Sequence, residues 1–123
     1  MAEHEKLVIM ATHGPEDPEL ATIPFVMACA ALASDVDVVM GFQANGVTLI
    51  RKGEAERVFA PDFPPLTKLM ADFTELGGKM LVCSPCMKSR QLIAPDHIVP
   101  GAEVVAAGRF IAEVTSATST LVY

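Results

Sequence analysis

The chain has 123 residues, which suits a single domain (residues 1–123), and 51% of them are hydrophobic while only 6% are aromatic. Its formal net charge of −6 and pI near 4.9 argue against direct binding to nucleic acid, because phosphates attract basic surfaces and repel acidic ones. The first apolar run, Leu7–Ala11, is too short for a signal-peptide core or a membrane span. We therefore expect a cytoplasmic protein with no membrane segment, and the odd number of cysteines, three, argues against a disulfide framework.

The first half of the chain alternates between strand and helix patterns. Leu7–Ala11 is a continuous apolar run, typical of a strand that is buried on both faces. Asp17-Pro18 is a helix-start pattern, and an Ala-rich helical segment follows as far as Ala33. Pro24 interrupts this segment, so the helix either begins near Thr22 or bends at the proline.

The middle of the chain repeats this alternation. Val36–Phe42 is rich in β-branched residues and predicts a second strand, and a short apolar stretch, Gly46–Ile50, comes after it. The apolar residues of 66–76 recur at helical spacing, which predicts an amphipathic helix that closes at Gly77-Gly78. Lys79–Cys83 reads as a third strand.

The C-terminal part is predicted to contain a helix from about Glu103 to Thr115 and a last strand at Thr120–Tyr123. Strands that alternate with helices indicate an α/β domain with a mostly parallel sheet. In such a sheet ligands bind along the carboxyl ends of the strands. We therefore expect the loops at His13, after Phe42 and at Cys83 to converge on one edge.

The sharpest chemical signal is the Cys-x-x-Cys pair, Cys83 and Cys86, with Ser84-Pro85 between them. The pair falls where a predicted strand meets a predicted helix. Unpaired backbone N–H groups and the helix dipole favour a thiolate there, and a thiolate is both a nucleophile and a sulfur acceptor. A second thiol three residues later can receive sulfur from the first or form a disulfide with it. Lys88 and Arg90 add positive charge nearby.

The remaining candidate residues carry weaker signals. His13, next to Gly14, follows the first strand and is a candidate acid/base or donor-orienting group, with an exposed loop histidine as the alternative. Cys29 lies in an Ala-rich helix and reads as a small buried apolar residue. One Cys-x-x-Cys supplies only two of the four ligands that zinc prefers, so we expect no metal, and no cofactor motif is present.

Three segments together resemble the DsrE/DsrF-like family of small sulfur-relay proteins, some of which are labelled peroxiredoxin-like. They are the first strand with Thr12–Pro18 and its Ala-rich helix, the stretch from Asn45 to Gly53, and the strand with Cys83–Lys88. The resemblance spans nearly the whole chain. It implies a flavodoxin-like three-layer domain with about five strands and a homo-oligomer, often a trimer or hexamer.

For the function, the resemblance implies a persulfide held on the cysteine at the strand–helix junction, which is Cys83 here. It also implies sulfur exchange with partner proteins of the TusA or rhodanese type. We therefore hypothesise a sulfur carrier or sulfurtransferase in which Cys86 assists Cys83, and in which His13, Gly14, Lys88 and Arg90 contact the substrate. Two alternatives remain open: a dithiol/disulfide oxidoreductase that uses the same pair, and a non-enzymatic oligomeric module that binds a small ligand.

Overall fold

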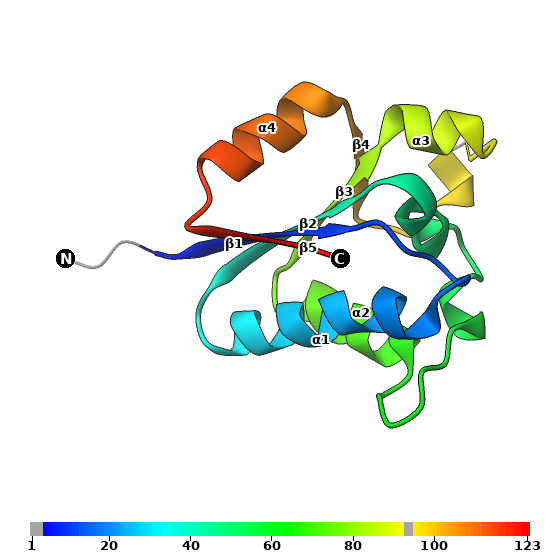
Figure 1. The fold of residues 1–123 in the computed structure, drawn as a ribbon, viewed down its shortest axis with the longest axis horizontal. Helices are drawn as coiled ribbons and strands as arrows, with labels where there is room; N and C mark the ends of the chain where they lie inside the picture. The colour runs from blue at the N-terminus through cyan, green and yellow to red at the C-terminus, as the bar shows by residue number, and fades with distance from the viewer. Residues whose placement is uncertain (1–3, 93–94) are drawn as a thin grey trace.

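The computed structural model describes residues 4–92 and 95–123 as a sheet covered by helices (Figure 1). The strands are β1 (Lys6–Ala11), β2 (Asp37–Phe42), β3 (Lys79–Cys83), β4 (Ala102–Val105) and β5 (Ser119–Val122). The α-helices are α1 (Pro18–Ala33), α2 (Leu66–Glu75), α3 (Ser84–Ser89) and α4 (Ala107–Thr115), and the 3-10 helices are η1 (Ala44–Ile50), η2 (Ala55–Arg57) and η3 (Pro95–His97). Within these ranges, no helix is both long enough and apolar enough to cross a bilayer.

The five strands form one sheet in the order β4-β3-β2-β1-β5, and every neighbouring pair is parallel. The predicted α/β class, with a mostly parallel sheet of about five strands, is therefore confirmed. The central strands β1, β2 and β3 are mostly buried, as their apolar sequences predict, because helices cover both faces.

The sheet separates two hydrophobic clusters. Helices α1 and α2 pack against one face and α4 against the other, which gives the predicted flavodoxin-like three-layer arrangement (Figure 1). In the larger cluster the ring of Phe25 on α1 lies 5.5 Å from that of Phe73 on α2 and 6.0 Å from that of Phe42 on β2. The smaller cluster joins Leu81 of β3 to Phe110 of α4.

The sequence prediction was wrong about the region around Glu103. Residues 102–105 form edge strand β4 and are not the start of a helix, which begins only at Ala107. Val104 and Val105 are β-branched and pair with β3, and the backbone of Ala106 is extended (φ −102°, ψ 176°). The short segment carries no alternating pattern of its own, so only pairing with β3 reveals it.

Helix α1 is continuous from Pro18 to Ala33, so the alternative that it begins near Thr22 is wrong. The side chain of Asp17 accepts a hydrogen bond from the Leu20 N–H at 3.1 Å and caps the first turn, as the sequence predicts. Pro24 lies inside this helix, and the Thr22 hydroxyl donates to the Pro18 carbonyl at 2.7 Å one turn earlier.

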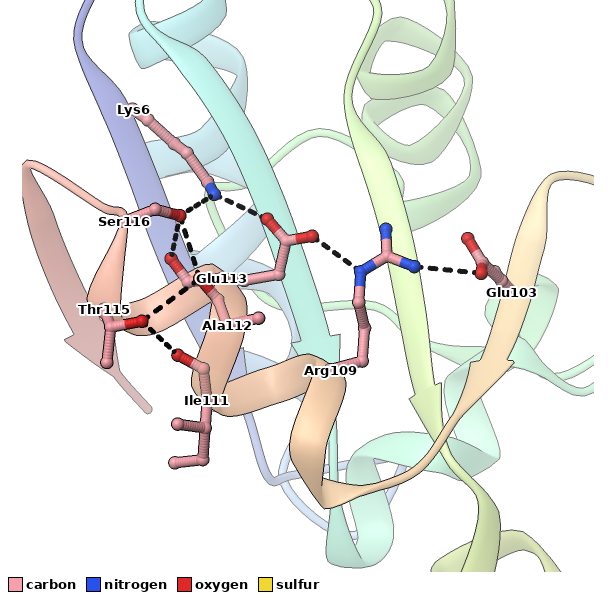
Figure 2. Close-up of polar contacts among 8 residues, drawn as sticks. All are labelled: Lys6, Glu103, Arg109, Ile111, Ala112, Glu113, Thr115 and Ser116. Atoms are coloured by element: carbon pink, nitrogen blue, oxygen red, sulfur yellow. Dashed lines mark hydrogen bonds and ion pairs between the residues drawn. The ribbon is translucent and has the colours of Figure 1, made fainter.

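A charged network ties α4 to strands β4 and β1 (Figure 2). The Arg109 guanidinium donates to Glu113 at 2.7 Å and to Glu103 of β4 at 3.0 Å, and Lys6 of β1 pairs with Glu113 from the other side. The hydrogen bonds from Lys6 and Arg109 outweigh burial and hold the pKa of Glu113 below its ordinary value. Lys6 is the first residue of β1, whereas Cys83 is the last residue of β3, so this end of the network lies at the opposite end of the sheet from the cysteines.

Candidate functional site

The carboxyl ends of β1, β2 and β3 carry three loops that meet, as the sequence predicts. The β2 loop reaches the cysteine segment directly, because the Ala44 N–H donates a 3.3 Å hydrogen bond to Cys86 Sγ. The β1 loop reaches the β2 loop, because the Gln43 N–H donates to the Ala11 carbonyl at 3.1 Å. A single edge of the sheet therefore brings together functional groups from distant parts of the chain.

The two cysteines lie in different backbone environments. Cys83 is the last residue of β3 and precedes the first residue of α3, and Cys86 lies within that helix. Both thiols are free and partly exposed, so reagents and partner groups can reach them. Because α3 has only 6 residues, its dipole is much weaker than that of a long helix.

Burial and hydrogen bonding shift the pKa values of the two thiols in opposite directions. Burial raises the pKa of Cys83, and the neighbouring Cys86 thiol raises it further. Burial alone would also raise the pKa of Cys86, but the Cys83 thiol, the Ala44 N–H and the charge of Arg90 together hold it below its ordinary value. The Cys86 N–H at the helix start and the charge of Arg90 act in the opposite direction on Cys83 and lower its pKa, so the predicted Cys83 thiolate stays a prediction.

Arg90 is the cation that acts on this pair, and neutral oxygens hold it in place. Its Nε and Nη2 atoms donate to Asn45 Oδ1 at 3.1 and 2.8 Å. Its Nη1 atom donates to the Cys86 carbonyl at 3.2 Å and to Ser89 Oγ at 3.1 Å. None of these partners carries a charge, so the positive charge of Arg90 remains available to the thiol or to a ligand.

His13 and Gly14 lie in the loop after β1 and contact Glu16. His13 Nδ1 lies 2.8 Å from Glu16 Oε2, and the Gly14 N–H donates to Glu16 Oε1 at 2.7 Å. A side chain at position 14 would collide with Thr48 and with the Asn45 carbonyl, so Gly14 permits close packing of the β1 and β2 loops. Neither residue contacts a cysteine among the hydrogen bonds of the described chain, and their predicted role in substrate binding stays a prediction.

Lys88 and Cys29 lie outside this constellation. Lys88 is exposed on α3, and neither thiol owes its pKa shift to it. Cys29 is half-buried in α1, where its Sγ donates to the Leu69 carbonyl at 3.4 Å and burial raises its pKa. Cys29 therefore packs against the core as a small apolar residue, although it is only partly buried and not fully buried as predicted.

Two adjoining cavities lie beside the cysteine edge. One, of about 280 Å³, is lined by Pro15, Glu16, Asn45, Thr48, Arg51, Glu54, Arg90 and Leu92. The other, of about 210 Å³, is lined by Arg51, Arg90, Gln91, Leu92 and His97. A larger hollow, of about 480 Å³, is an apolar groove along α2 that shares no lining residue with these two cavities.

Sequence reasoning missed Ala44, Asn45, Arg51 and His97. Ala44 contributes only a backbone N–H, with φ of +51°, and its residue type gives no signal of that role. Asn45 and Arg90 are far apart in sequence and meet only through the fold. Arg51 and His97 come together because the backbone at 50–52 pairs with that at 97–99.

Comparison with known proteins agrees with this architecture. The sequence model of the DsrE/DsrF-like family matches residues 5–123. Among solved structures, the ychN protein from E. coli superimposes with a TM-score of 0.80 at 19% identity, and MTH1491 from Methanobacterium thermoautotrophicum, a protein of unknown function, with a TM-score of 0.71 at 16% identity. Each alignment covers 97% of this chain and 99% of the other, and at such low identity the likeness establishes the fold.

Two relatives come from Methanocaldococcus jannaschii. The uncharacterized protein MJ0760 is 32% identical over 107 residues, which are 87% of this chain but only 38% of that protein. The uncharacterized protein MJ0989 is 26% identical over 118 residues, which are 96% of this chain and 99% of that protein. With a family match from near the N-terminus to the last residue, the chain belongs to the DsrE/DsrF-like family.

Proposed function

We propose that this protein is a sulfur carrier or sulfurtransferase that holds a persulfide on Cys83, with Cys86 assisting. Membership of the DsrE/DsrF-like family suggests a sulfur-relay role at the level of the family. The observation that supports the finer proposal is the pairing of two accessible thiols of unequal acidity at one sheet edge, with Ala44 N–H and Arg90 directed at Cys86.

The unequal acidity suggests a division of labour. The Cys86 thiolate attacks the outer sulfur of a donor persulfide, a new S–S bond forms, and the donor's S–S bond breaks as its thiolate leaves with the electron pair. Cys83 then loses its proton to solvent, and its thiolate attacks the outer sulfur on Cys86, which releases the Cys86 thiolate. A less basic thiolate is the better leaving group, so sulfur moves from Cys86 to Cys83 and is retained there. No external oxidant or reductant is needed.

The proposal is tested by mass spectrometry of reduced protein after incubation with a persulfide donor, with peptide mapping to locate the added sulfur. We expect one labile sulfur on Cys83. The Cys86→Ser variant should load Cys83 more slowly, and the Cys83→Ser variant should carry a short-lived sulfur on Cys86. Cys29→Ser is the matched control and should behave as the unsubstituted protein.

Two results would contradict this assignment. Sulfur that stays on Cys86 in the unsubstituted protein would refute storage on Cys83. Loss of two hydrogens with no sulfur gained, abolished by either Cys83→Ser or Cys86→Ser, would instead identify a dithiol/disulfide oxidoreductase, the alternative that the closeness of the two thiols also supports.

We further propose that the chain works as a homo-oligomer, a trimer or hexamer, and exchanges sulfur with a partner of the TusA or rhodanese type. Such an assembly would cover some of the large apolar side chains that are exposed on the isolated chain, and a contiguous patch of such residues marks an interface. The exposed side chains are Met27, Phe59, Leu76, Val104, Ile111 and Val122. Light scattering after gel filtration tests the assembly, and sulfur transfer from a loaded partner of either type tests the exchange.

A further inference from the structure

The unpaired cations of this acidic protein gather beside the cysteine edge. Of its nine Lys and Arg residues, four form ion pairs with described carboxylates: Lys6, Arg57, Lys68 and Arg109. The five that make no such pair within residues 4–92 and 95–123 are Arg51, Lys52, Lys79, Lys88 and Arg90. Arg51 and Arg90 line both cavities beside the cysteine edge, and Lys52 and Lys88 are their near neighbours in the sequence.

The smaller of the two adjoining cavities concentrates this charge. Arg51, Arg90 and His97 line it, and among residues 4–92 and 95–123 no carboxylate does. The larger cavity also contains Glu16 and Glu54, which are already engaged, Glu16 by His13 and the Gly14 N–H and Glu54 by Arg57. An anion in the larger cavity would still face two carboxylates, whereas one in the smaller cavity would face none among the described lining residues.

Backbone pairing brings the segments that carry Arg51 and His97 together. Arg51 and Ile98 form an antiparallel bridge, the Lys52 N–H donates to the His97 carbonyl at 2.9 Å, and the Val99 N–H donates to the Ile50 carbonyl at 2.8 Å. Arg90 is held by Asn45 from the opposite side. At about 210 Å³ the cavity is several times larger than the roughly 30 Å³ that one water molecule occupies in the liquid.

We propose that this cavity binds the anionic group of a small sulfur compound and so delivers its sulfur to the neighbouring cysteine pair. Arginine guanidinium groups match oxyanions and carboxylates through paired N–H donors. Arg90 links the two sites, since it lines the cavity and also donates to the Cys86 carbonyl. The shared chemistry is an oxyanion group, carried either by an inorganic sulfur oxyanion or by a carboxylate-bearing persulfide.

The inference rests on the proposed function for its chemical step. With thiosulfate as donor, the Cys86 thiolate attacks the outer sulfur, the S–S bond of thiosulfate breaks, and sulfite leaves with the electron pair. With glutathione persulfide, the outer sulfur is attacked in the same way and the glutathione thiolate leaves. In both cases the donor's own S–S bond supplies the electrophilic sulfur, so no further reagent is consumed.

Binding and transfer are measured separately. Calorimetric titration of the Cys83→Ser/Cys86→Ser protein with thiosulfate and with glutathione reports binding without reaction. Arg51→Gln should weaken binding of one of these anions by about tenfold or more, since a hydrogen bond to a charged group contributes at least that factor. Lys79→Gln removes the same charge at the opposite end of β3 and should leave binding unchanged.

The transfer assay uses otherwise unsubstituted cysteines. Arg51→Gln should slow sulfur uptake from the anionic donor that binds, but leave uptake from the persulfide of 2-mercaptoethanol, which has no carboxylate or oxyanion group, unchanged. If Arg51→Gln slows uptake from thiosulfate alone, the cavity binds an inorganic oxyanion. If it slows uptake from glutathione persulfide alone, the cavity binds a carboxylate. Equal effects of Arg51→Gln and Lys79→Gln, or no binding of either anion, would overturn the inference. Failure of the relay itself would show differently, as anion binding with no sulfur taken up from any donor.

Discussion

Gly46 controls how closely the β2 loop approaches the end of β1, and Gly46→Ala is the sharpest test of how the site is held together. A Cβ at position 46 would lie 2.8 Å from the Ala11 carbonyl carbon and nearer still to its oxygen. Carbon atoms in contact normally lie about 3.5–4.0 Å apart, so the loop must move by roughly 1 Å. Both neighbours are backbone atoms of a buried strand, so the loop is the part that yields.

This displacement should affect stability and thiol chemistry together. Overpacking of this kind costs about 1–3 kcal/mol of the free energy of unfolding, which for a chain of this length lowers Tm by roughly 3–15 °C. A shift of about 1 Å also lengthens the 3.3 Å hydrogen bond from the Ala44 N–H to Cys86 Sγ beyond useful range. The pKa of Cys86 should therefore rise toward its ordinary value.

The assay pairs thermal unfolding with the pH profile of Cys86 alkylation, resolved by peptide mapping. Gly108→Ala is the matched control, because a Cβ there meets nothing within 4 Å and the residue lies inside helix α4, where alanine favours the helix. It should keep or raise Tm and leave the alkylation profile unchanged. If Gly46→Ala matches Gly108→Ala in both measurements, the loop does not hold Cys86 in its acidic state.

Three further predictions concern charge and packing. Arg90→Gln should raise the pKa of Cys86 and slow its alkylation near neutral pH, whereas an unchanged pH profile would show that the guanidinium does not act on the thiol. Glu113→Gln should lower the free energy of unfolding at neutral pH by about 1–2 kcal/mol. Because folding lowers the pKa of Glu113, this contribution is complete above the pKa of the unfolded state and fades as the pH falls through the pKa of the folded state. The difference in unfolding free energy between variant and parent, measured with urea, should therefore vanish in acid. A difference that persists in acid would contradict the assignment. Phe25→Ala should cost about 3–5 kcal/mol in the same assay, while Phe59→Ala, at a ring that is 67% exposed, should cost little; equal losses would contradict the described core.

Much of the fold could be predicted because its signals are local. Continuous apolar runs identified β1, β2 and β3, and the Asp17-Pro18 pair identified the start of α1. The Cys83–Cys86 spacing at a strand–helix junction indicated the site, because the two thiols and the end of the strand can both be recognised from neighbouring residues. Parallel strands then required their carboxyl ends to share an edge.

The tertiary structure decided what depends on distant partners. Strand β4 is recognisable only by its pairing with β3, since an edge strand of 4 residues has too few positions to show a period. The pKa of Cys86 depends on a backbone N–H from Ala44, which the sequence does not reveal, and on Arg90, which the sequence places near the cysteines but which only the fold brings to Asn45. Local sequence thus determined which groups are present and on which elements they lie. Contacts between loops determined the electrostatic environment of those groups, because charges and hydrogen bonds act through space between residues that only folding brings together.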